Sequence, residues 1–484
     1  MPVQDEPLEQ RWRDGAEDPD SDAPQAPSPP STPSLPSTPS LPAEPAPPSA
    51  PSAPPATAAV LLAAPRDGVP VVVSDRTGLA ATARRMVAGT GPLAVDAERA
   101  SGHRYGQRAF LVQLRRAGAG TALIDPEALP DLSSLGTALA GTEWVIHAAS
   151  QDLPCLADLG MVPRTLFDTE LGGRLAGLER VGLATMAEQL LGLTLAKEHS
   201  AVDWSTRPLP EPWLRYAALD VEVLIELRDA VEQELARQGK LDWAREEFAA
   251  VLAAPPPPAR PDPWRRTSGL HRVRDRRRLA VVRELWTTRD ALARQRDLAP
   301  GRVLPDAAIV EAALASSTTT EGLAGVPAFS ARGARRNTAE WLAAIRRAQA
   351  LPDADLPSQH LPAEGPPPAR LWYEREPAAA ARLAACRQSL GEIAQKYTLP
   401  VENLLSPDTV RRLAWQPPDP CDEGSVEAAL RAQGARSWQV ALCLPALVAG
   451  LCQDGGQDGG QDGGASGSED GGQDGGASGS EDGE

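Results

Sequence analysis

The chain has 484 residues, of which 42% are hydrophobic and 23% are charged, and its formal net charge is −17 at pH 7. This length exceeds what one compact core can hold, so about three domains are expected. The chain opens with no basic-then-apolar leader, and its apolar runs fall short of the ~20 residues that cross a bilayer. These features argue against a membrane protein and predict a soluble one.

Both ends of the chain have compositions that are typical of disordered tails. Residues 1–57 contain 17 of the 49 prolines and hardly an aliphatic side chain, and residues 453–484 repeat Gln-Asp-Gly-Gly and Ala-Ser-Gly-Ser-Glu-Asp. Burial of apolar surface could not offset the entropy lost on folding either segment. The tails carry net charges of −7 and −9, so residues 58–452 keep only −1. The acidic total therefore does not exclude a nucleic-acid substrate.

Residues 66–254 combine strand and helix signals. Short apolar runs of strand length, bounded by Gly, Pro or Asp, are Val71–Val73, Leu93–Val95, Phe110–Leu114, Ala122–Ile124 and Trp144–Ile146. Three of these runs lie too close together for crossover helices, so an antiparallel meander is expected there. Apolar residues recur at helical spacing from Glu211 to Arg237. The segment predicts an α/β domain with a mixed sheet.

Three acidic motifs lie within this segment. Asp96 and Glu98 follow an apolar run, and because positions i and i+2 of a strand face the same way, their carboxylates project together. Tyr216 and Asp220 share one face of a helix at i and i+4, and Asp152 lies between the two pairs in sequence. Hard divalent cations such as Mg²⁺ or Mn²⁺ prefer such oxygen ligands. The motifs predict a site for two metal ions beside a phosphodiester.

The order of these motifs resembles that of the DEDD superfamily of 3′→5′ exonucleases, in the branch whose third motif carries Tyr, and most closely the ribonuclease D family. Residues 105–114 and 197–209 extend the match, which covers about residues 66–250. The resemblance implies a ribonuclease H-like fold. It also implies trimming of RNA that has a free 3′ end, such as transfer RNA precursors.

The resemblance also assigns roles at the site. It implies that Asp96 bridges two metal ions, that Glu98 and Asp220 complete the site nearer the attacking water, and that Asp152 holds the second ion through water. Tyr216 would orient the water by hydrogen bonding, because a phenol with an ordinary pKa of about 10 is a poor base at neutral pH.

Four further residues are candidates for binding the substrate. Gln113 lies on a predicted strand, and Lys197 and Arg207 flank the loop before the third motif, where cations could meet phosphates. Trp204 could stack on a terminal base. An aromatic residue beside Asp203 is also compatible with simple loop packing, and both interpretations stay open.

Structural roles compete with the functional ones. Asp152 could cap the helix that follows it. Asp168-Thr169-Glu170 also reads as Asp-x-Glu, but it lies between the second and third motifs, and a helix cap with a first-turn acid explains it. We expect His147 and His199 to be core or loop residues and assign them no acid–base role.

The chain beyond the prolines of residues 255–263 has an almost wholly helical pattern. Residues 266–350 resemble an HRDC domain, the nucleic-acid-binding module that follows the nuclease in the ribonuclease D family, most clearly over residues 300–306. Residues 264–302 hold 12 arginines against 4 acids, which suits phosphate binding but also a solvated helix face. Residues 370–451 match the second, more divergent helical domain of the family, so two all-α HRDC-type domains are expected.

Several local features are predicted in these helical segments. The predicted core positions are Leu279, Val282, Leu285, Trp286, Leu292, Leu383, Leu390, Ile393 and Leu404. Asp306 is expected to cap a helix, and Asn337 with Glu340 resembles a capping box. The five cysteines show no metal-ligand spacing and predict neither a zinc site nor a disulfide framework, which favours a reducing, cytoplasmic location.

Other functions remain compatible with parts of the pattern. A DNA-directed exonuclease would use the same acids, and the sequence does not report on recognition of a 2′-hydroxyl. A non-catalytic RNA-binding adaptor would have no use for clustered acids, which are costly to bring together. A two-carboxylate glycosidase would leave the phenol idle. The sequence identifies no protein partner.

Overall fold

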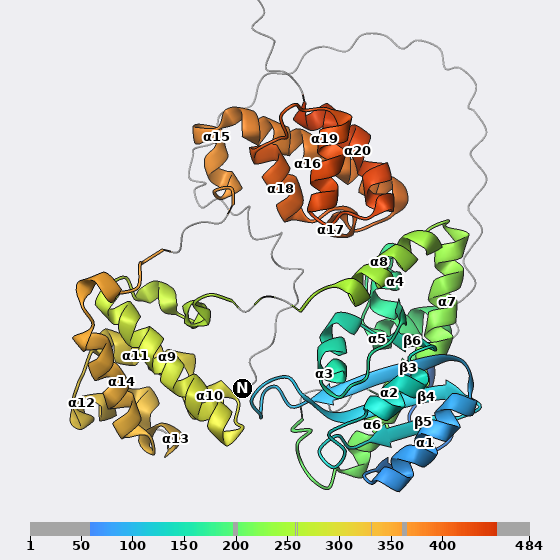
Figure 1. Ribbon diagram of the computed structural model, residues 1–484, viewed down its shortest axis with the longest axis horizontal. Coiled ribbons are helices and arrows are strands. Elements are labelled where there is room, and N and C mark those ends of the chain that lie inside the picture. The colour runs from blue at the N-terminus through green and yellow to red at the C-terminus, as the bar shows by residue number, and fades with distance from the viewer. Residues whose placement is uncertain are drawn as a thin grey trace, which may run out of the picture. The chain divides into compact units, whose positions relative to one another are not determined.

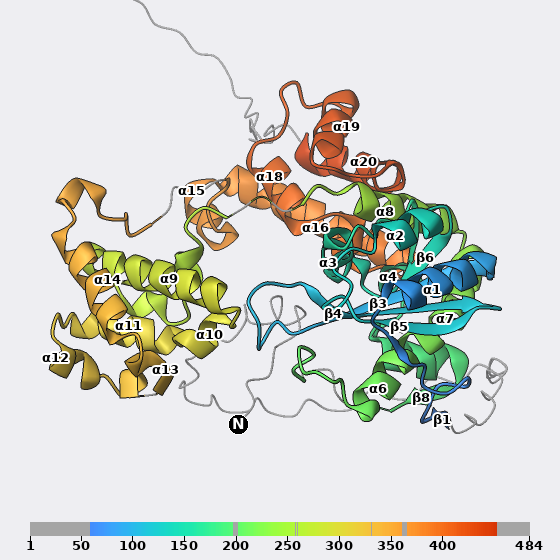
Figure 2. The same cartoon turned by 60° about the horizontal axis from the view of Figure 1, so that its bottom comes forward.

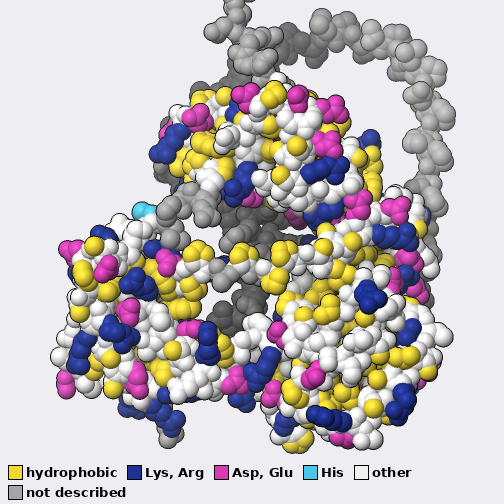
Figure 3. All heavy atoms as spheres, viewed as in Figure 1, with side chains coloured by type: hydrophobic (Ala, Val, Ile, Leu, Met, Phe, Trp, Pro, Cys, Tyr) yellow, Lys and Arg dark blue, Asp and Glu magenta, His cyan; other side chains and the backbone are white. Residues whose placement is uncertain are grey.

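The computed structural model describes residues 59–196, 202–256, 258, 260–330, 332–360 and 365–452. Within these ranges an α/β part precedes two helical parts (Figures 1 and 2). The two tails that the sequence predicts to be disordered lie outside the described residues. On the face drawn in Figure 3, basic and acidic side chains are interspersed, as the near-zero net charge of residues 58–452 leads one to expect.

The α/β part is built on one six-stranded sheet with the strand order β2-β5-β4-β3-β6-β7. Its strands are β2 (Val72–Val73), β3 (Thr90–Arg99), β4 (Ala109–Ala117), β5 (Gly120–Ile124), β6 (Glu143–Ile146) and β7 (Thr165–Asp168). The antiparallel meander is confirmed as β3-β4-β5, and the remaining pairs are parallel. A separate parallel pair joins β1 (Val60–Leu62) to β8 (Leu193–Leu195). Strands β1, β7 and β8, which have three or four residues each, were not predicted.

Eight helices accompany the strands in the described α/β part. They are α1 (Arg76–Ala88), α2 (Ser133–Leu139), α3 (Leu153–Asp158), α4 (Thr169–Leu175), α5 (Leu183–Met186), α6 (Glu211–Glu222), α7 (Leu224–Arg237) and α8 (Leu241–Ala253). The predicted single helix 211–237 is wrong in one respect, because the structure divides it at Val223. The division has a packing reason: α6 contacts β3, β4 and β5, whereas α7 contacts β3, β6 and α4.

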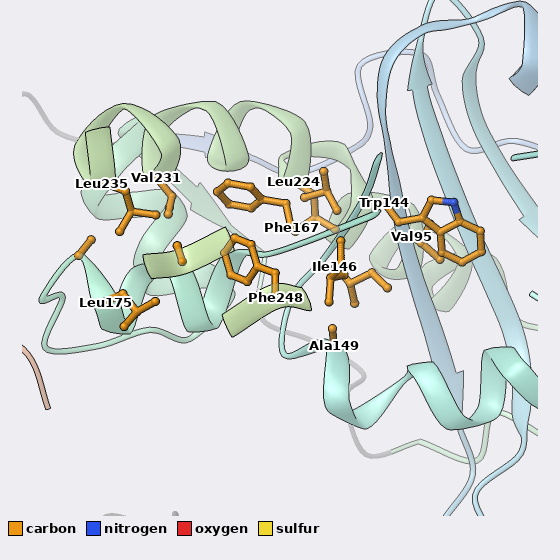
Figure 4. Packing of buried hydrophobic residues seen from close by; sticks show 14 of the residues in the cluster. Val95, Trp144, Ile146, Ala149, Phe167, Leu175, Leu224, Val231, Leu235 and Phe248 are labelled. Atoms are coloured by element: carbon orange, nitrogen blue, oxygen red, sulfur yellow. The ribbon is translucent and has the colours of Figure 1, made fainter. Parts of the chain in front are cut away.

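The pairing of β3 with β4 decides which side chains face the site. Asp96 lies directly opposite Gln113, and Ala97 lies opposite Val112. Side chains alternate along a strand, so Asp96 and Glu98 share one face while Ala97 turns to the other. The core continues beside β7, where the rings of Phe167 and Phe248 lie 4.9 Å apart (Figure 4).

The first helical part contains α9 (Arg276–Arg296), α10 (Pro300–Val303), α11 (Asp306–Ala315), α12 (Thr320–Ala324), α13 (Arg332–Arg335) and α14 (Thr338–Ala350). The predicted core face is confirmed, with Leu279, Val282 and Leu285 buried and Trp286 and Leu292 partly buried against them.

Of the two predicted caps in this part, Asp306 is wrong, and Asn337 occupies the N-cap position of α14 without the side-chain hydrogen bond of a capping box. Asp306 is the first residue of α11, and its carboxylate accepts hydrogen bonds from Ser268 and Arg289. Asn337 precedes α14, but its amide oxygen accepts from Arg296 and its amide nitrogen donates to the Gly333 carbonyl. Tertiary hydrogen bonds therefore occupy both polar side chains, and neither side chain caps its helix.

The second helical part contains α15 (Trp372–Arg375), α16 (Pro377–Tyr397), α17 (Val401–Leu404), α18 (Pro407–Trp415), α19 (Glu423–Ala432) and α20 (Ser437–Leu451). Leu383, Leu390 and Leu404 are buried and Ile393 is partly buried, as predicted.

One cysteine prediction needs correction, because Cys421 and Cys452 form a disulfide with their Cα atoms 5.4 Å apart. The two residues are 31 positions apart in sequence, so only the packing of the helices between them brings them together. The other three cysteines are free and buried. Among the described helices, none is long and apolar enough to cross a membrane.

Candidate active site

Two elements bring three carboxylates together. Asp96 and Glu98 project from β3, and Asp220 projects from α6, which packs across β3, β4 and β5. One carboxylate oxygen from each residue lies within 4.8 Å of the corresponding oxygens of the other two. The prediction that the first and third motifs converge is therefore supported by the geometry.

Asp152 reaches the same neighbourhood from a turn. The chain leaves β6 at Ile146, passes through Ala148 and the short 3-10 helix η2 (Ala149–Gln151), and arrives at Asp152 before α3. The competing role as a helix cap is wrong, because the Asp152 side chain makes no capping hydrogen bond. Its Oδ1 atom is buried and has no hydrogen-bond partner among the described residues. A buried oxygen without a donor is suited to a cation.

Burial disfavours ionisation of all four carboxylates, and the charges of neighbouring acids add to this at Glu98, Asp152 and Asp220. Burial raises the pKa of Asp96 to about 6 and that of Asp152 to about 8, with the charge of Asp96 adding to the shift at Asp152. Burial and then the charges of Asp96, Asp220 and Asp152 raise the pKa of Glu98 well above its usual range. Burial, followed by the charge of Asp96, does the same for Asp220. Such a cluster is stabilised by bound positive charge.

Tyr216 stands one helical turn before Asp220 and forms a hydrogen bond with its side chain. Burial raises the pKa of Tyr216 above its ordinary value, and the charges of Asp220, Glu98 and Asp96 raise it further. The hydroxyl therefore remains protonated at neutral pH. It can orient a neighbouring water or oxygen by hydrogen bonding but cannot serve as a base.

Arg99 is a site residue that the sequence analysis missed. One of its terminal nitrogens lies 3.4 Å from Asp152 Oδ1, at ion-pair distance but without a hydrogen bond to that atom. The same nitrogen donates to Gln151. The charge of Arg99 lowers the pKa values of Asp96, Glu98 and Asp152 against the other influences. Its position directly after Glu98 was the available signal.

The donor set fits hard divalent cations. Asp96, Glu98 and Asp220 offer three converging oxygens, and Asp152 offers an oxygen without a hydrogen-bond donor. All of these ligands are oxygens, as Mg²⁺ and Mn²⁺ prefer. When the four acids are ionised, their combined negative charge exceeds what Arg99 can offset. The structure thus contains a candidate metal centre formed by the four acids.

Gln113 lies inside the site and not on its surface. Its side chain is fully buried opposite Asp96, and neither amide atom has a hydrogen-bond partner within the described ranges. Direct contact between Gln113 and RNA would require the residues that bury Gln113 to move. A role in orienting the Asp96 side chain suits the geometry better.

The other substrate-binding candidates have different surroundings. Trp204 is fully buried against Trp213 and Tyr216, with ring centroids 5.6 and 6.5 Å away, so stacking on a base would require the loop to rearrange. The Arg207 guanidinium binds both oxygens of Asp125 at 2.7 and 2.8 Å and also donates to three backbone carbonyls. Lys197 lies outside the described residues.

The second Asp-x-Glu pattern has the structural role that was predicted for it. Asp168 caps α4 by accepting hydrogen bonds from the backbone of Glu170 and Leu171. His147 is a largely buried histidine beside Thr169, and burial lowers its pKa to about 4, so it is neutral at physiological pH. His199 lies outside the described residues.

Family models match three ranges of the chain. Residues 70–236 match a 3′-5′ exonuclease model, residues 278–345 an HRDC domain model, and residues 365–451 a model described as a 3′ to 5′ exonuclease C-terminal domain.

Individual relatives match over most of the chain. The ribonuclease D of Gluconacetobacter diazotrophicus is 32% identical over 72% of this chain and 87% of its own length, and that of Acidiphilium cryptum is 33% identical over 73% and 89%. A crystal structure of a protein from Bifidobacterium adolescentis is similar with a TM-score of 0.76 and 39% identity, covering 81% of this chain and 99% of that one. The Escherichia coli RNase D structure, described as an exoribonuclease involved in structured RNA processing, has a TM-score of 0.58 and 25% identity, covering 79% and 98%.

Proposed function

The chain belongs to the ribonuclease D family, and we propose that it hydrolyses RNA from the 3′ end with Asp96, Glu98, Asp152, Tyr216 and Asp220 as its catalytic group. Membership of this family, with its 3′-5′ exonuclease and HRDC matches, makes the protein a 3′→5′ exoribonuclease with a ribonuclease H-like fold. The observation that carries the assignment of the site is the convergence of three carboxylates within 4.8 Å, with Asp152 as their buried neighbour.

Each residue of the group has a proposed task. Asp96, Glu98 and Asp220 would hold one divalent cation, and Asp96 with Asp152 would hold a second, Mg²⁺ or Mn²⁺ in both cases. Bound there, such ions supply the charge that activates a water and offsets the charge on the departing 3′ oxygen. Tyr216 keeps its proton, as its raised pKa requires, and directs its hydroxyl toward the site to orient the attacking water.

The helical part around α9 offers arginine side chains that would bind the phosphates of RNA. Most of its arginines are held by partners within the same part: Arg276 donates to carbonyls of residues 353–357, Arg277 pairs with Asp353, and Arg289 pairs with Asp306. Arg266, Arg272, Arg274 and Arg278 are exposed, and their guanidinium groups have no hydrogen-bond or ion-pair partner within the described residues. We assign phosphate contact to these four.

A salt titration tests that assignment. Changing both Arg272 and Arg274 to Ala should reduce the slope of log affinity against log salt for single-stranded RNA by about 1.4, because each lost phosphate contact removes about 0.7. Fluorescence anisotropy between ~50 and ~300 mM salt measures the slope. The matched control changes Arg76 and Arg84 on α1, which are also exposed, and should leave the slope unchanged. Equal slopes for both double variants and the parent would remove these arginines from the interface.

A single assay tests the activity itself. The full chain is incubated with a 5′-labelled RNA that ends in a single-stranded 3′ overhang, with Mg²⁺, with Mn²⁺ or with a chelator. Stepwise shortening from the 3′ end with release of mononucleotides is expected only with the metal. A DNA oligonucleotide of matched sequence distinguishes the rival DNA exonuclease, which would degrade it at least as fast. Metal-independent cleavage, or none, would contradict the proposed site.

The remaining proposals concern organisation, substrate and place. We propose three domains over about residues 66–254, 266–350 and 370–451, supported by the matched ranges and by the grouping of elements. Structured RNAs such as transfer RNA precursors are the proposed substrates, on the strength of family membership. A cytoplasmic location stays a prediction, and the disulfide of Cys421 and Cys452 does not favour it, since disulfides are rare in reducing compartments.

A further inference from the structure

Asp168 does more than cap a helix. The residue is 4% exposed, and its carboxylate accepts four backbone hydrogen bonds. Two come from the first turn of α4, at Glu170 (3.0 Å) and Leu171 (3.1 Å). The other two come from the turn after β6, at Ala148 (3.1 Å) and Ala149 (2.8 Å). One buried carboxylate thus joins two segments that are about twenty residues apart in sequence.

The turn that Asp168 holds has a backbone conformation that alanine rarely adopts. Ala148 lies in the left-handed region with φ 58° and ψ 51°, which is unfavourable for a residue with a Cβ atom. The conformation persists only when its surroundings impose it. The two backbone donors flanking this strained position are the ones that bind Asp168. The carboxylate is therefore placed to keep Ala148 left-handed.

Hydrogen bonds continue from this turn to the metal-site residue. The Gln151 backbone N–H donates to the Ala148 carbonyl at 3.0 Å, and the Asp152 N–H donates to the Ala149 carbonyl at 3.1 Å. Asp152 is the single proposed ligand that comes from a turn, since Asp96 and Glu98 lie on β3 and Asp220 lies on α6. Its direction into the site consequently depends on this chain of contacts.

The base from which Asp168 acts is rigid. Phe167 packs against Phe248 in the core, and Ala149 is fully buried in the same cluster (Figure 4). Helix α4 lies close against α7, because a Cβ atom on Gly172 would come within 2.8 Å of the Val231 side chain. Neither β7 nor α4 can shift easily, so the position of the carboxylate is well defined.

We propose that Asp168 is a positioning residue of the metal centre: by tying the left-handed turn at Ala148 to α4, its carboxylate fixes the orientation in which Asp152 meets the second cation. This inference rests on the proposed metal-dependent function and extends it to a residue outside the acidic motifs. The pattern Asp168-Thr169-Glu170 thereby gains a role in the reaction without any contact with the substrate.

Metal binding by the full chain tests the proposal. Asp168→Asn places an amide NH₂ group against backbone donors, so the turn loses part of its hold. The Mn²⁺ affinity of the weaker site, measured by isothermal titration calorimetry or by electron paramagnetic resonance of free Mn²⁺, should fall at least tenfold. An affinity equal to that of the parent would overturn the proposal, whatever happens to the melting temperature.

Rescue by glycine separates positioning from mere stability. Glycine adopts the left-handed conformation without steric cost, so Ala148→Gly should allow the turn to persist when Asp168 is weakened. The double variant Asp168→Asn with Ala148→Gly is expected to regain at least half of the lost Mn²⁺ affinity on a logarithmic scale. Its melting temperature should stay low, because the cap of α4 remains damaged. A double variant that binds Mn²⁺ as weakly as Asp168→Asn would refute the proposed route through Ala148.

Two more variants keep the test decisive. Ala148→Val leaves Asp168 and the α4 cap intact but puts a β-branched residue in the left-handed region, so Mn²⁺ affinity should again fall about tenfold. This variant replaces Asp168→Asn if that protein does not fold. Asp75→Asn, which weakens the cap of α1, should lower stability slightly and leave Mn²⁺ affinity unchanged. A parent protein that binds no Mn²⁺ would contradict the proposed function, whereas binding that ignores Asp168 and Ala148 would contradict only this inference.

Discussion

Two segments of the α/β part contain the same Asp-x-Glu pattern, but the surroundings of their carboxylates are opposite in kind. At the β7–α4 junction, four backbone N–H groups satisfy the Asp168 carboxylate, and Glu170 pairs with Arg174 one helical turn later. On β3, Asp96 and Glu98 instead face Asp220, another carboxylate.

The difference lies in the partners that the fold provides. A buried carboxylate surrounded by donors stabilises the fold, whereas buried carboxylates that face each other need a bound cation to be stable in the ionised form. The tripeptide pattern alone does not distinguish the two cases. The positioning role proposed for Asp168 adds a link between them, because the satisfied carboxylate then orients Asp152 for the unsatisfied group.

The largest expected effect separates the two segments by activity. Asp96→Asn should lower the rate of RNA trimming about a thousandfold or more, because the residue that both proposed cations share loses its charge. The fold should remain intact, as circular dichroism and a cooperative melting transition would show. An Asp96→Asn variant that trims RNA at nearly the parent rate would contradict the catalytic role proposed for the β3 segment.

The pH dependence of stability provides the next test. In the absence of divalent cations, the folded state binds more protons than the unfolded chain, since the folded pKa values of Asp96 (about 6) and Asp152 (about 8) lie above the ordinary value for Asp. The contribution of these acids to the free energy of unfolding should therefore fall as pH rises from about 4 to about 8, at a scale of about 1.4 kcal/mol per unit of pKa shift. His147, whose pKa burial lowers to about 4, contributes a smaller change of the opposite sign up to about pH 6.5. Urea unfolding with a chelator at several pH values measures the net change.

Saturating Mg²⁺ should flatten this decline, because the bound cation favours the ionised carboxylates. Asp152→Asn should remove part of it as well. Asp75→Asn, at an exposed cap on α1, serves as the control and should keep the full decline. A chelated protein whose stability rises steadily from pH 4 to pH 8 would contradict the view that burial and neighbouring acids raise the pKa values of the four carboxylates.

A smaller effect is expected at Arg99, the cation that partly offsets the acids. Arg99→Ala should lower the stability of the metal-free protein by about 0.5–1 kcal/mol, since the ion pair with Asp152 is partly exposed on the arginine side. The increase in melting temperature on adding Mg²⁺ should become larger than in the parent. Thermal scans with and without Mg²⁺ measure both quantities, and an unchanged Mg²⁺ effect would mean that Arg99 does not balance this cluster.

The smallest effect is expected at the other Glu of the compared pair. Glu170→Gln removes a partly exposed i, i+4 ion pair with Arg174, which is worth about 0.3–0.5 kcal/mol. RNA trimming and Mn²⁺ affinity should match those of the parent. Loss of metal binding in this variant would show that the charge of Glu170 contributes to the metal centre, and that the two Asp-x-Glu segments do not differ in the proposed way.

The sequence by itself was enough to predict the part of the site that depends on local periodicity. The alternation of a strand puts Asp96 and Glu98 on one face, and the helical repeat puts Tyr216 near Asp220, so each pair could be recognised from its spacing. The meander β3-β4-β5 was likewise predictable, because the short connections leave no room for crossover helices. The family resemblance added the roles, and the relatives confirm the family.

The partners of the polar groups depend on contacts between elements, which the sequence pattern does not report. Contacts between residues that are distant in sequence bury Trp204 and pair Arg207 with Asp125. Such contacts also bind the side chains of Asp306 and Asn337, and they bring Cys421 and Cys452 together in a disulfide. The same is true of the four donors around Asp168. Periodicity reports which face a side chain takes, whereas packing between elements determines what it meets there.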